Sequence, residues 1–186
     1  MKGLGERYRN TEASTSTEFE KLPPGGYVCT IKKVTDHHEA DKPFLEVVYD
    51  IREGKYADFY ADEWGQSNEW AHSNRHYYSD AAMGMFKGFL KAVDESNNTN
   101  FEEMAGEDWD EQRLLGKAIG YIIGEEEYEG NDGSVKTRLK VRGARSIQAI
   151  REGRFKQPET KKLATAEADP LIPSKPDVIN TDDLPF

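Results

Sequence analysis

The chain has 186 residues, a formal net charge of −10, 36% hydrophobic residues and 32% charged residues. This length fits one domain with polar extensions and is short for two domains of ordinary size. The single cysteine, Cys29, excludes an internal disulfide, and no apolar run approaches the roughly 20 residues that a membrane span needs.

The first residues predict a polar arm followed by a folded domain. Residues 1–21 have no periodic apolar pattern and no signal-peptide stretch, so we expect a flexible N-terminal arm and a cytoplasmic location. The sequence Leu-Pro-Pro-Gly-Gly at residues 22–26 turns the chain. We expect the domain to extend over residues 22–157.

Three strands are predicted in the first half of this domain. β-Branched and aromatic residues predict strands at residues 27–34 and 42–51. Residues 52–55 are typical of a tight turn into a third strand at residues 56–61. In that strand Ala57, Phe59 and Ala61 alternate with Tyr56, Asp58 and Tyr60. Together the three strands form a meander.

A helix and two further strands follow. Apolar residues at helical spacing predict a helix that is capped by Ser79 or Asp80 and ends at residues 97–98. The order of three strands, a helix and two strands is that of a five-stranded oligonucleotide-binding (OB) barrel. Other small β-barrels and α+β sandwiches share this order. The remaining predicted segments are a loop with one helical turn at 101–113, a strand at 115–125, a turn at 129–133 and a strand at 135–142.

Small residues and prolines have their own pattern. Gly116, Gly120 and Gly124 lie on one parity of the fourth strand, which favours sharp coiling of the barrel or close approach of a helix. Beyond residue 157 apolar periodicity ends. Residues 158–186, which contain five prolines, predict a disordered acidic tail.

The charges are distributed unevenly. Residues 136–162 carry ten basic residues and two acids, whereas residues 163–186 carry five acids and one base. Alternation in the fifth strand places a row of basic side chains on one face. Such a row suits a polyanion, although an edge strand protected against aggregation gives the same pattern. We interpret the row as a phosphate-binding surface made of Lys136, Arg138, Lys140, Arg142 and Arg145, with Lys33 of the first strand as a further cation.

Binding of single strands also needs flat surfaces on which unpaired bases stack. Tyr56, Tyr60 and Trp64 are the candidates that we select, and core packing is the alternative for each of them. Tyr56 and Tyr60 are expected on the face of the third strand opposite Phe59. Further stacking candidates in this part of the sequence are Phe44, Trp70, Tyr77 and Tyr78.

No pattern of catalytic or metal-binding residues stands out. His72 and His76 are four residues apart and Glu69 precedes His72 by three, but this spacing is not that of known hydrolase metal sites. Phosphate loops, serine elbows and paired carboxylates are missing from the sequence. We therefore expect no cofactor, no metal and no enzymatic activity.

Two parts of the sequence resemble one family. The last residues, Asp182-Asp183-Leu184-Pro185-Phe186, are similar to the C-terminal tip of bacterial and phage single-stranded DNA-binding proteins (SSBs): an acidic run that closes with an aliphatic residue, proline and phenylalanine. The segments LPPGGYV, KPFL and YDI, at residues 22–28, 42–45 and 49–51, resemble phage-encoded SSBs of Gram-positive hosts.

This resemblance implies an OB-fold protein of the host-cell cytoplasm that coats single-stranded DNA in phage replication, recombination and repair. It also implies that the tip at residues 182–186 recruits replication or recombination proteins. Only two acids directly precede Leu184, which departs from the family pattern. The domain does not look like the housekeeping bacterial protein, so a tetramer is not implied and homo-oligomerisation stays open.

Two other functions fit parts of the sequence. The net charge and the acidic stretches at residues 102–111 and 125–129 are those expected of an acidic DNA mimic that inhibits a DNA-binding enzyme. The basic fifth strand argues against it. A recombination mediator or annealing protein that binds strands only within a complex is the second alternative. Nothing in the sequence separates DNA from RNA.

Overall fold

The structure is a computed structural model that describes residues 21–106 and 109–163. The predicted arm up to residue 20 and the predicted tail from residue 164, with its docking tip at residues 182–186, lie outside the described residues. The described part is mainly β, with one long helix and several short ones. Within it, no helix is long and apolar enough to cross a membrane.

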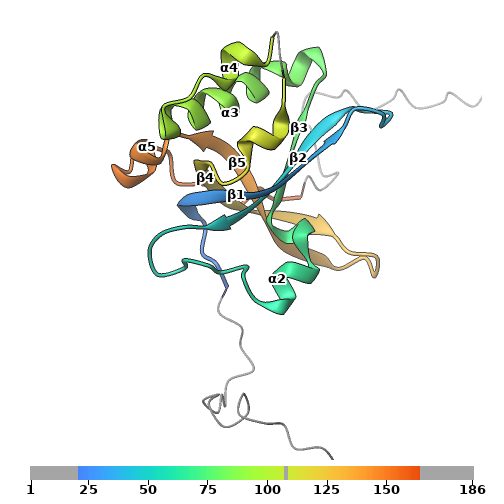
Figure 1. The fold of residues 1–186 in the computed structure, drawn as a ribbon. Helices are drawn as coiled ribbons and strands as arrows, with labels where there is room; N and C mark the ends of the chain where they lie inside the picture. Colours follow the sequence, from blue (N-terminus) through green and yellow to red (C-terminus); the bar gives the residue numbers. More distant parts are fainter. Residues whose placement is uncertain (1–20, 107–108, 164–186) are drawn as a thin grey trace, which may run out of the picture.

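Five antiparallel strands form one sheet, seen in Figure 1. They are β1 (Gly25–His37), β2 (Phe44–Ile51), β3 (Ser73–Tyr77), β4 (Ala118–Glu129) and β5 (Val135–Arg145). Their order in the sheet is β3-β2-β1-β4-β5. The central strand β1 pairs through residues 25–30 with β4 and through residues 29–37 with β2. Because β3 and β5 are its edges, the sheet that these pairings form is open and not a closed barrel.

A β-bulge in β1 decides which of its side chains point outward. The register against β2 shifts by one residue between Ile31 and Lys33. Ile31 is buried, and past the bulge the buried residue is Val34 rather than Lys33. Because side chains alternate between the two faces of a strand, the extra residue moves Lys33, Thr35 and His37 to the outward face.

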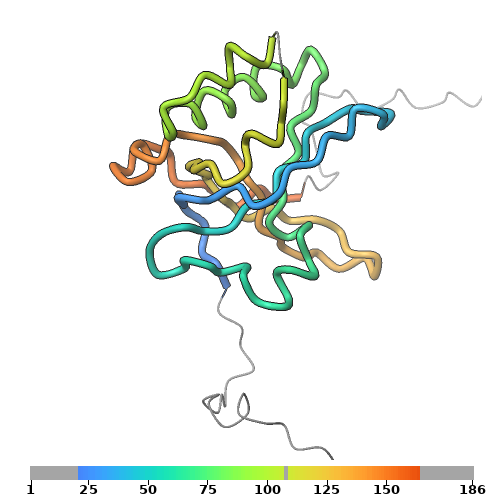
Figure 2. Tube along the Cα trace, in the orientation of Figure 1, coloured from blue at the N-terminus to red at the C-terminus, as the bar shows by residue number. Residues whose placement is uncertain are grey.

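The core lies between the inward face of the sheet and helix α3 (Asp80–Asn97). Phe86, Phe89, Leu90 and Val93 of α3 are buried against the sheet, as expected for an amphipathic helix. The helix ends at Asn98, whose backbone is left-handed with φ 54°. The short helices α4 (Phe101–Met104) and η2 (Glu111–Leu114) follow. Figures 1 and 2 show α3 and α4 together at one end of the sheet, with α2 (Glu63–Ser67) at the opposite end.

The predicted third strand at residues 56–61 is wrong. These residues form consecutive turns, with a positive φ of 56° at Asp58. The backbone amide of Tyr60 donates to the buried carboxylate of Asp50 at 3.1 Å, which fixes the segment to the end of β2. The third strand is β3, which lies between the predicted third strand and the predicted helix, where the sequence analysis expects no strand.

The other predicted strands and the long helix are confirmed, although their ends differ. Strands predicted at residues 27–34, 42–51, 115–125 and 135–142 correspond to β1, β2, β4 and β5. With β3 in place of the predicted third strand, the structure also has three strands before the long helix and two after it. Three short helices were not predicted: α2 (Glu63–Ser67), η1 (Glu69–His72) and α5 (Ile147–Arg151).

Glycines in β4 let the C-terminal part of the domain lie directly on the sheet. A Cβ atom at Gly120 would collide with Ile150 of α5, and one at Gly124 would come within 2.9 Å of Pro158. Ile150 belongs to a small apolar cluster on the outward face of β1 and β4. Close approach of a helix, one of the two roles expected for these glycines, is confirmed. Gly116 instead has a φ of 74° in the turn before β4.

Residues 158–163, which the sequence assigns to the tail, lie along β4. The amide of Lys161 donates to the carbonyl of Glu125, and the amide of Glu127 donates to the carbonyl of Lys161, both at 2.9 Å. This parallel pairing uses the edge of β4 beyond its ladder with β1. These residues therefore contact the folded domain.

Candidate nucleic-acid interface

The basic residues predicted in the fifth strand share the outward face of β5. Leu139 and Val141, on the other face, pack against the core, whereas Val135 near the hairpin turn is 60% exposed. A bulge opposite Ile122 and Ile123 shifts the register, so that Ala144 packs against the core and Arg145 points outward. We call this row the cation band; its members are Lys136, Arg138, Lys140, Arg142 and Arg145.

One glutamate lies beneath the middle of the cation band. Glu126 of β4 is only 14% exposed, and its Oε2 atom is 3.6–3.9 Å from cationic nitrogens of three band residues. Lys161 approaches the other carboxylate oxygen at 3.6 Å. Burial raises the pKa of Glu126, but the surrounding cations, Lys140 foremost, hold it below its ordinary value. The three band residues near Oε2 are Arg138, Lys140 and Arg142.

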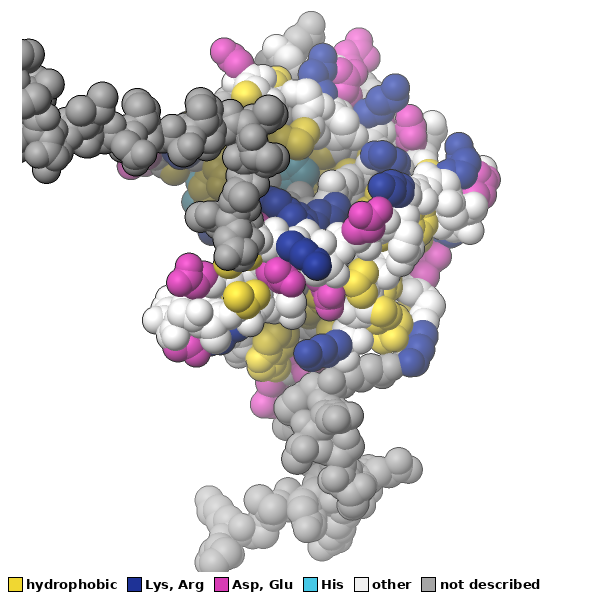
Figure 3. Space-filling model, turned by 180° about the vertical axis from the view of Figure 1, so that it is seen from behind, with side chains coloured by type: hydrophobic (Ala, Val, Ile, Leu, Met, Phe, Trp, Pro, Cys, Tyr) yellow, Lys and Arg dark blue, Asp and Glu magenta, His cyan; other side chains and the backbone are white. Residues whose placement is uncertain are grey.

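The hairpin end of the band is also partly neutralised. Lys136 pairs with Asp132 at 3.1 Å, and hydrogen bonds from Ser134 and Lys136 lower the pKa of Asp132 to about 2. The guanidinium of Arg138 lies 5.1 Å from the ring centre of Tyr128. In Figure 3, which views the molecule from behind, Lys and Arg side chains lie across the middle of the face.

A cluster of stacked rings occupies the outward face of β1, β2 and β3. The His37 and Phe44 rings stack with centroids 4.4 Å apart, and the Tyr77 ring is 5.5 Å from that of Phe44. The guanidinium of Arg75 lies 4.8 Å from the Phe44 ring centre. Tyr77 is 38% exposed. We call these four residues, His37, Phe44, Arg75 and Tyr77, the aromatic cluster.

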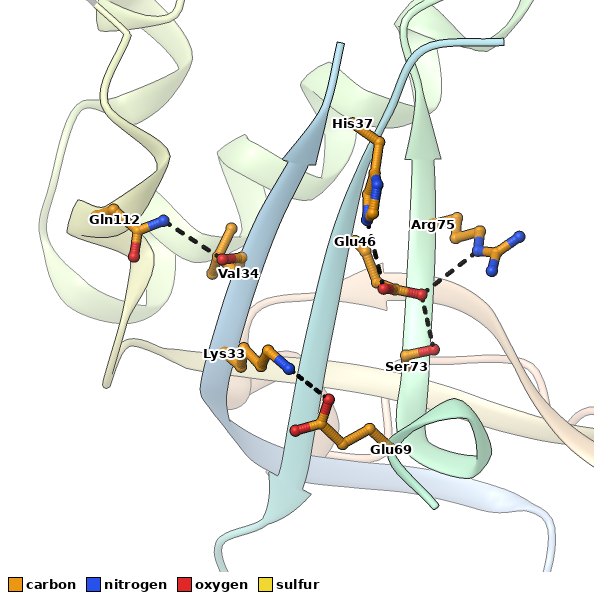
Figure 4. Close-up of polar contacts among 8 residues, drawn as sticks. All are labelled: Lys33, Val34, His37, Glu46, Glu69, Ser73, Arg75 and Gln112. Atoms are coloured by element: carbon orange, nitrogen blue, oxygen red, sulfur yellow. Dashed lines mark hydrogen bonds and ion pairs between the residues drawn. The ribbon is translucent and has the colours of Figure 1, made fainter. Parts of the chain in front are cut away.

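Glu46 organises the polar part of this face, as Figure 4 shows. Its carboxylate is 3.5 Å from the His37 ring and 3.4 Å from Nε of Arg75, and the Ser73 hydroxyl donates to it at 3.4 Å. The register of the strands places Glu46 directly opposite Arg75. The carboxylate therefore holds the guanidinium over the Phe44 ring.

Two exposed tryptophans lie at the start of β3. Trp64 in α2 is 53% exposed and Trp70 in the 3₁₀ helix η1 (Glu69–His72) is 69% exposed, with ring centres 6.5 Å apart. Glu69 of the same turn pairs with Lys33 of β1 at 2.6 Å, which joins this segment to the outward face of the sheet (Figure 4).

Buried hydrogen bonds fix the segment that carries the tryptophans. The His72 ring makes contacts through both nitrogens, with the carbonyls of Tyr49 and Gly65, and stacks on Tyr60 at 4.4 Å. The Asp62 carboxylate caps α2 by accepting from the amide of Gly65 at 2.8 Å. The two tryptophans are therefore presented on a structured insertion between β2 and β3.

The selected aromatic residues lie in different environments. Trp64 is on the surface. Tyr60 is 5% exposed, so its ring packs in the core, and Tyr56 is half-buried with an edge contact to Tyr27 at 6.2 Å. The face opposite Phe59 that the prediction required does not form, because this segment is not a strand.

The sequence does not predict the aromatic cluster as a unit. Phe44 and Tyr77 are among its further stacking candidates, whereas His37 and Arg75 are not. Their proximity follows from the pairing of Phe44 with both His37 and Tyr77 across neighbouring strands. The sequence does not predict the polar strand at residues 73–77, whose pairing with β2 brings Tyr77 beside Phe44.

His72 and His76 make separate contacts in the core. Both are buried, and His76 stacks on Phe89 with ring centres 4.0 Å apart. In the two described segments, no group of three or more His, Cys, Asp or Glu residues is placed to hold a metal ion.

No protein-family model matches the sequence, and no curated protein is significantly similar to it. The resemblance to SSBs therefore stands on the residues of this chain alone.

Proposed function

We propose that this chain binds single-stranded DNA with little sequence preference and without catalysis, in an SSB-type role in replication or recombination. The aromatic cluster provides surfaces for bases, and the cation band contacts phosphates. Recruitment of other proteins through residues 182–186 belongs to the same proposal.

The partly exposed rings that contact one another on the outward sheet face carry this proposal. Stacking of a base on an aromatic side chain contributes about 1–3 kcal/mol. A folded chain gains little by leaving such rings in water, whereas a ligand with flat bases gains from them. Arg75 on the Phe44 ring keeps its outer N–H groups available for phosphate oxygens.

The topology supports an OB-fold assignment within the proposal. Closing the sheet would bring its edges β3 and β5 together, and the long helix connects β3 to β4 as in that fold. OB-folds bind oligonucleotides on strands 2 and 3 and on the loops that follow strands 1 and 4. Three members of the aromatic cluster, Phe44, Arg75 and Tyr77, lie on the corresponding strands β2 and β3. Figure 1 shows the β1–β2 and β4–β5 hairpins projecting to the same side.

The DNA-mimic alternative fits the structure less well. A mimic needs free carboxylates in an ordered row, but Glu126 lies beneath cations. Glu125 accepts a hydrogen bond from Thr160 at 3.2 Å, and Glu127 accepts one from the amide of Leu163 at 3.0 Å. These three consecutive acids of β4 are therefore engaged within the domain.

The test is a titration of fluorescent oligothymidylate with wild type and Tyr77→Ala. We expect Tyr77→Ala to weaken binding by about 1–3 kcal/mol, because one stacking surface is lost. The free energy of unfolding should change little, since the ring is already partly exposed.

Met85→Ala is the matched control, because Met85 is an exposed apolar side chain on α3, away from the aromatic cluster. Duplex DNA and RNA of equal length serve as competitors. Equal affinities of Tyr77→Ala and Met85→Ala for oligothymidylate would contradict the proposed stacking role.

A further inference from the structure

A surface hollow of about 640 Å³ lies between α3, the end of β5 and α5. Its walls are joined directly, because the amide of Ile147 donates to the hydroxyl of Ser96 at 3.0 Å. Gly88 contributes no side chain on the α3 side, and a Cβ atom there would meet nothing within 4 Å. The hollow is therefore preformed and open.

Three cations, from α3, from β5 and from the segment after α5, line this hollow against one acid, Glu95. Among the described residues, Lys91 and Arg145 have no ion pair, and Arg145 donates only to the neighbouring carbonyl of Ala144 at 2.8 Å. Arg154 pairs with Glu152 at 2.5 Å. The lining thus has more positive charge than its own acids neutralise.

Arg145 belongs to both the hollow and the cation band. The bulge in β5 that turns Arg145 outward therefore makes the two surfaces continuous. From Lys136 to Arg145 the strand spans roughly 30 Å at about 3.3 Å per residue. A polyanion that follows the band is led to the hollow at its end.

We infer that the hollow lined by Lys91, Arg145 and Arg154 binds phosphodiester groups of the same single strand, beyond the cation band. This inference rests on the proposed function and lengthens the surface that the single strand contacts. Guanidinium groups suit phosphate oxygens because they donate two parallel hydrogen bonds. The hollow adds to the binding of long strands only, because a short strand ends before it.

The experiment compares an oligothymidylate of about 16 nucleotides with one of about 8, both within the site sizes of single OB-folds. The variant is Lys91→Ala/Arg154→Ala, which leaves the band intact. We expect roughly fivefold weaker binding of the long strand and a salt slope shallower by about 0.7 for each lost contact. Binding of the short strand stays unchanged.

Two further variants make the result specific. Lys87→Ala removes a cation of the same helix that pairs with Glu102 instead of lining the hollow, so both affinities should match wild type. Glu95→Gln removes the acid of the hollow and should tighten binding of the long strand alone.

The failures are distinguishable. Suppose that wild type binds both strands and that the double variant binds each of them with the same affinity as wild type. The inference is then overturned while the proposed function stands, and an acidic protein segment becomes the alternative ligand of the hollow. If wild type binds neither strand, both are overturned.

Discussion

The buried histidine of β3 makes the stability of the domain depend on pH. His76 is 8% exposed and stacks on Phe89, and burial lowers its pKa to about 4. The amide group of Asn74 lies 3.1 Å from His76 Nε2, as expected if a neutral ring accepts a hydrogen bond. Because an unfolded chain has a histidine pKa near 6.5, it binds the proton more readily than the folded state between about pH 6.5 and pH 4.

Acidification should therefore destabilise the fold through His76. The contribution is fully present above about pH 6.5 and is lost as the pH falls toward 4. Urea unfolding at pH 7 and pH 5 should show that wild type loses about 2 kcal/mol more than His76→Gln. Equal losses in the two proteins would mean that the ring does not remain neutral in the folded state.

Single bulge residues decide the direction of two cations. By simple alternation Lys33 shares the face of the buried Ile31, and Arg145 shares the face of Val141, yet both point outward. The alternation of Lys136, Arg138 and Lys140 in β5 was predictable from the sequence because the bulge in this strand comes after them. A bulge depends on the partner strand, so alternation in one strand does not reveal it.

At the scale of elements, local pattern identified the long strands and the main helix but misplaced the third strand. Residues 56–61 alternate like a strand, yet their amides donate to nearby backbone carbonyls in turns and to the carboxylate of Asp50. Residues 73–77 are polar and short, and they become a strand only because β2 offers them an edge. The aromatic cluster depends on that pairing, so it could not be predicted without the tertiary fold.

Two glycines in helices should respond oppositely to alanine. Gly84 lies in the middle of α3, and a Cβ atom there would meet nothing within 4 Å. Gly84→Ala should raise the free energy of unfolding by about 0.5–1 kcal/mol, because alanine restricts the unfolded chain and favours helix.

Gly65 in α2 is the matched comparison, since its Cβ atom would collide with the backbone carbonyl of Tyr60. Gly65→Ala should lower the free energy of unfolding and disturb the segment that carries the tryptophans. Urea unfolding at pH 7 measures both changes. The same sign of change in the two variants would contradict this account of their packing.

At the scale of the whole molecule, a net charge of −10 coexists with a continuous basic surface. The acids of β4 that neighbour the cation band have partners within the domain. Glu126 lies among the band cations, whereas Glu125 and Glu127 contact residues 160–163. Long-range repulsion from the acidic remainder is screened within about 8–10 Å at ordinary ionic strength. Local phosphate contacts are therefore compatible with the acidic total.

The salt dependence of oligothymidylate binding tests the central claim most directly. If the cation band contacts about four or five phosphates, the logarithm of the association constant should fall with the logarithm of salt concentration with a slope near −3. Arg138→Ala/Lys140→Ala should make that slope shallower by about 1.4. Absence of binding at low salt, or an affinity that salt does not change, would contradict a surface that binds single strands through their phosphates.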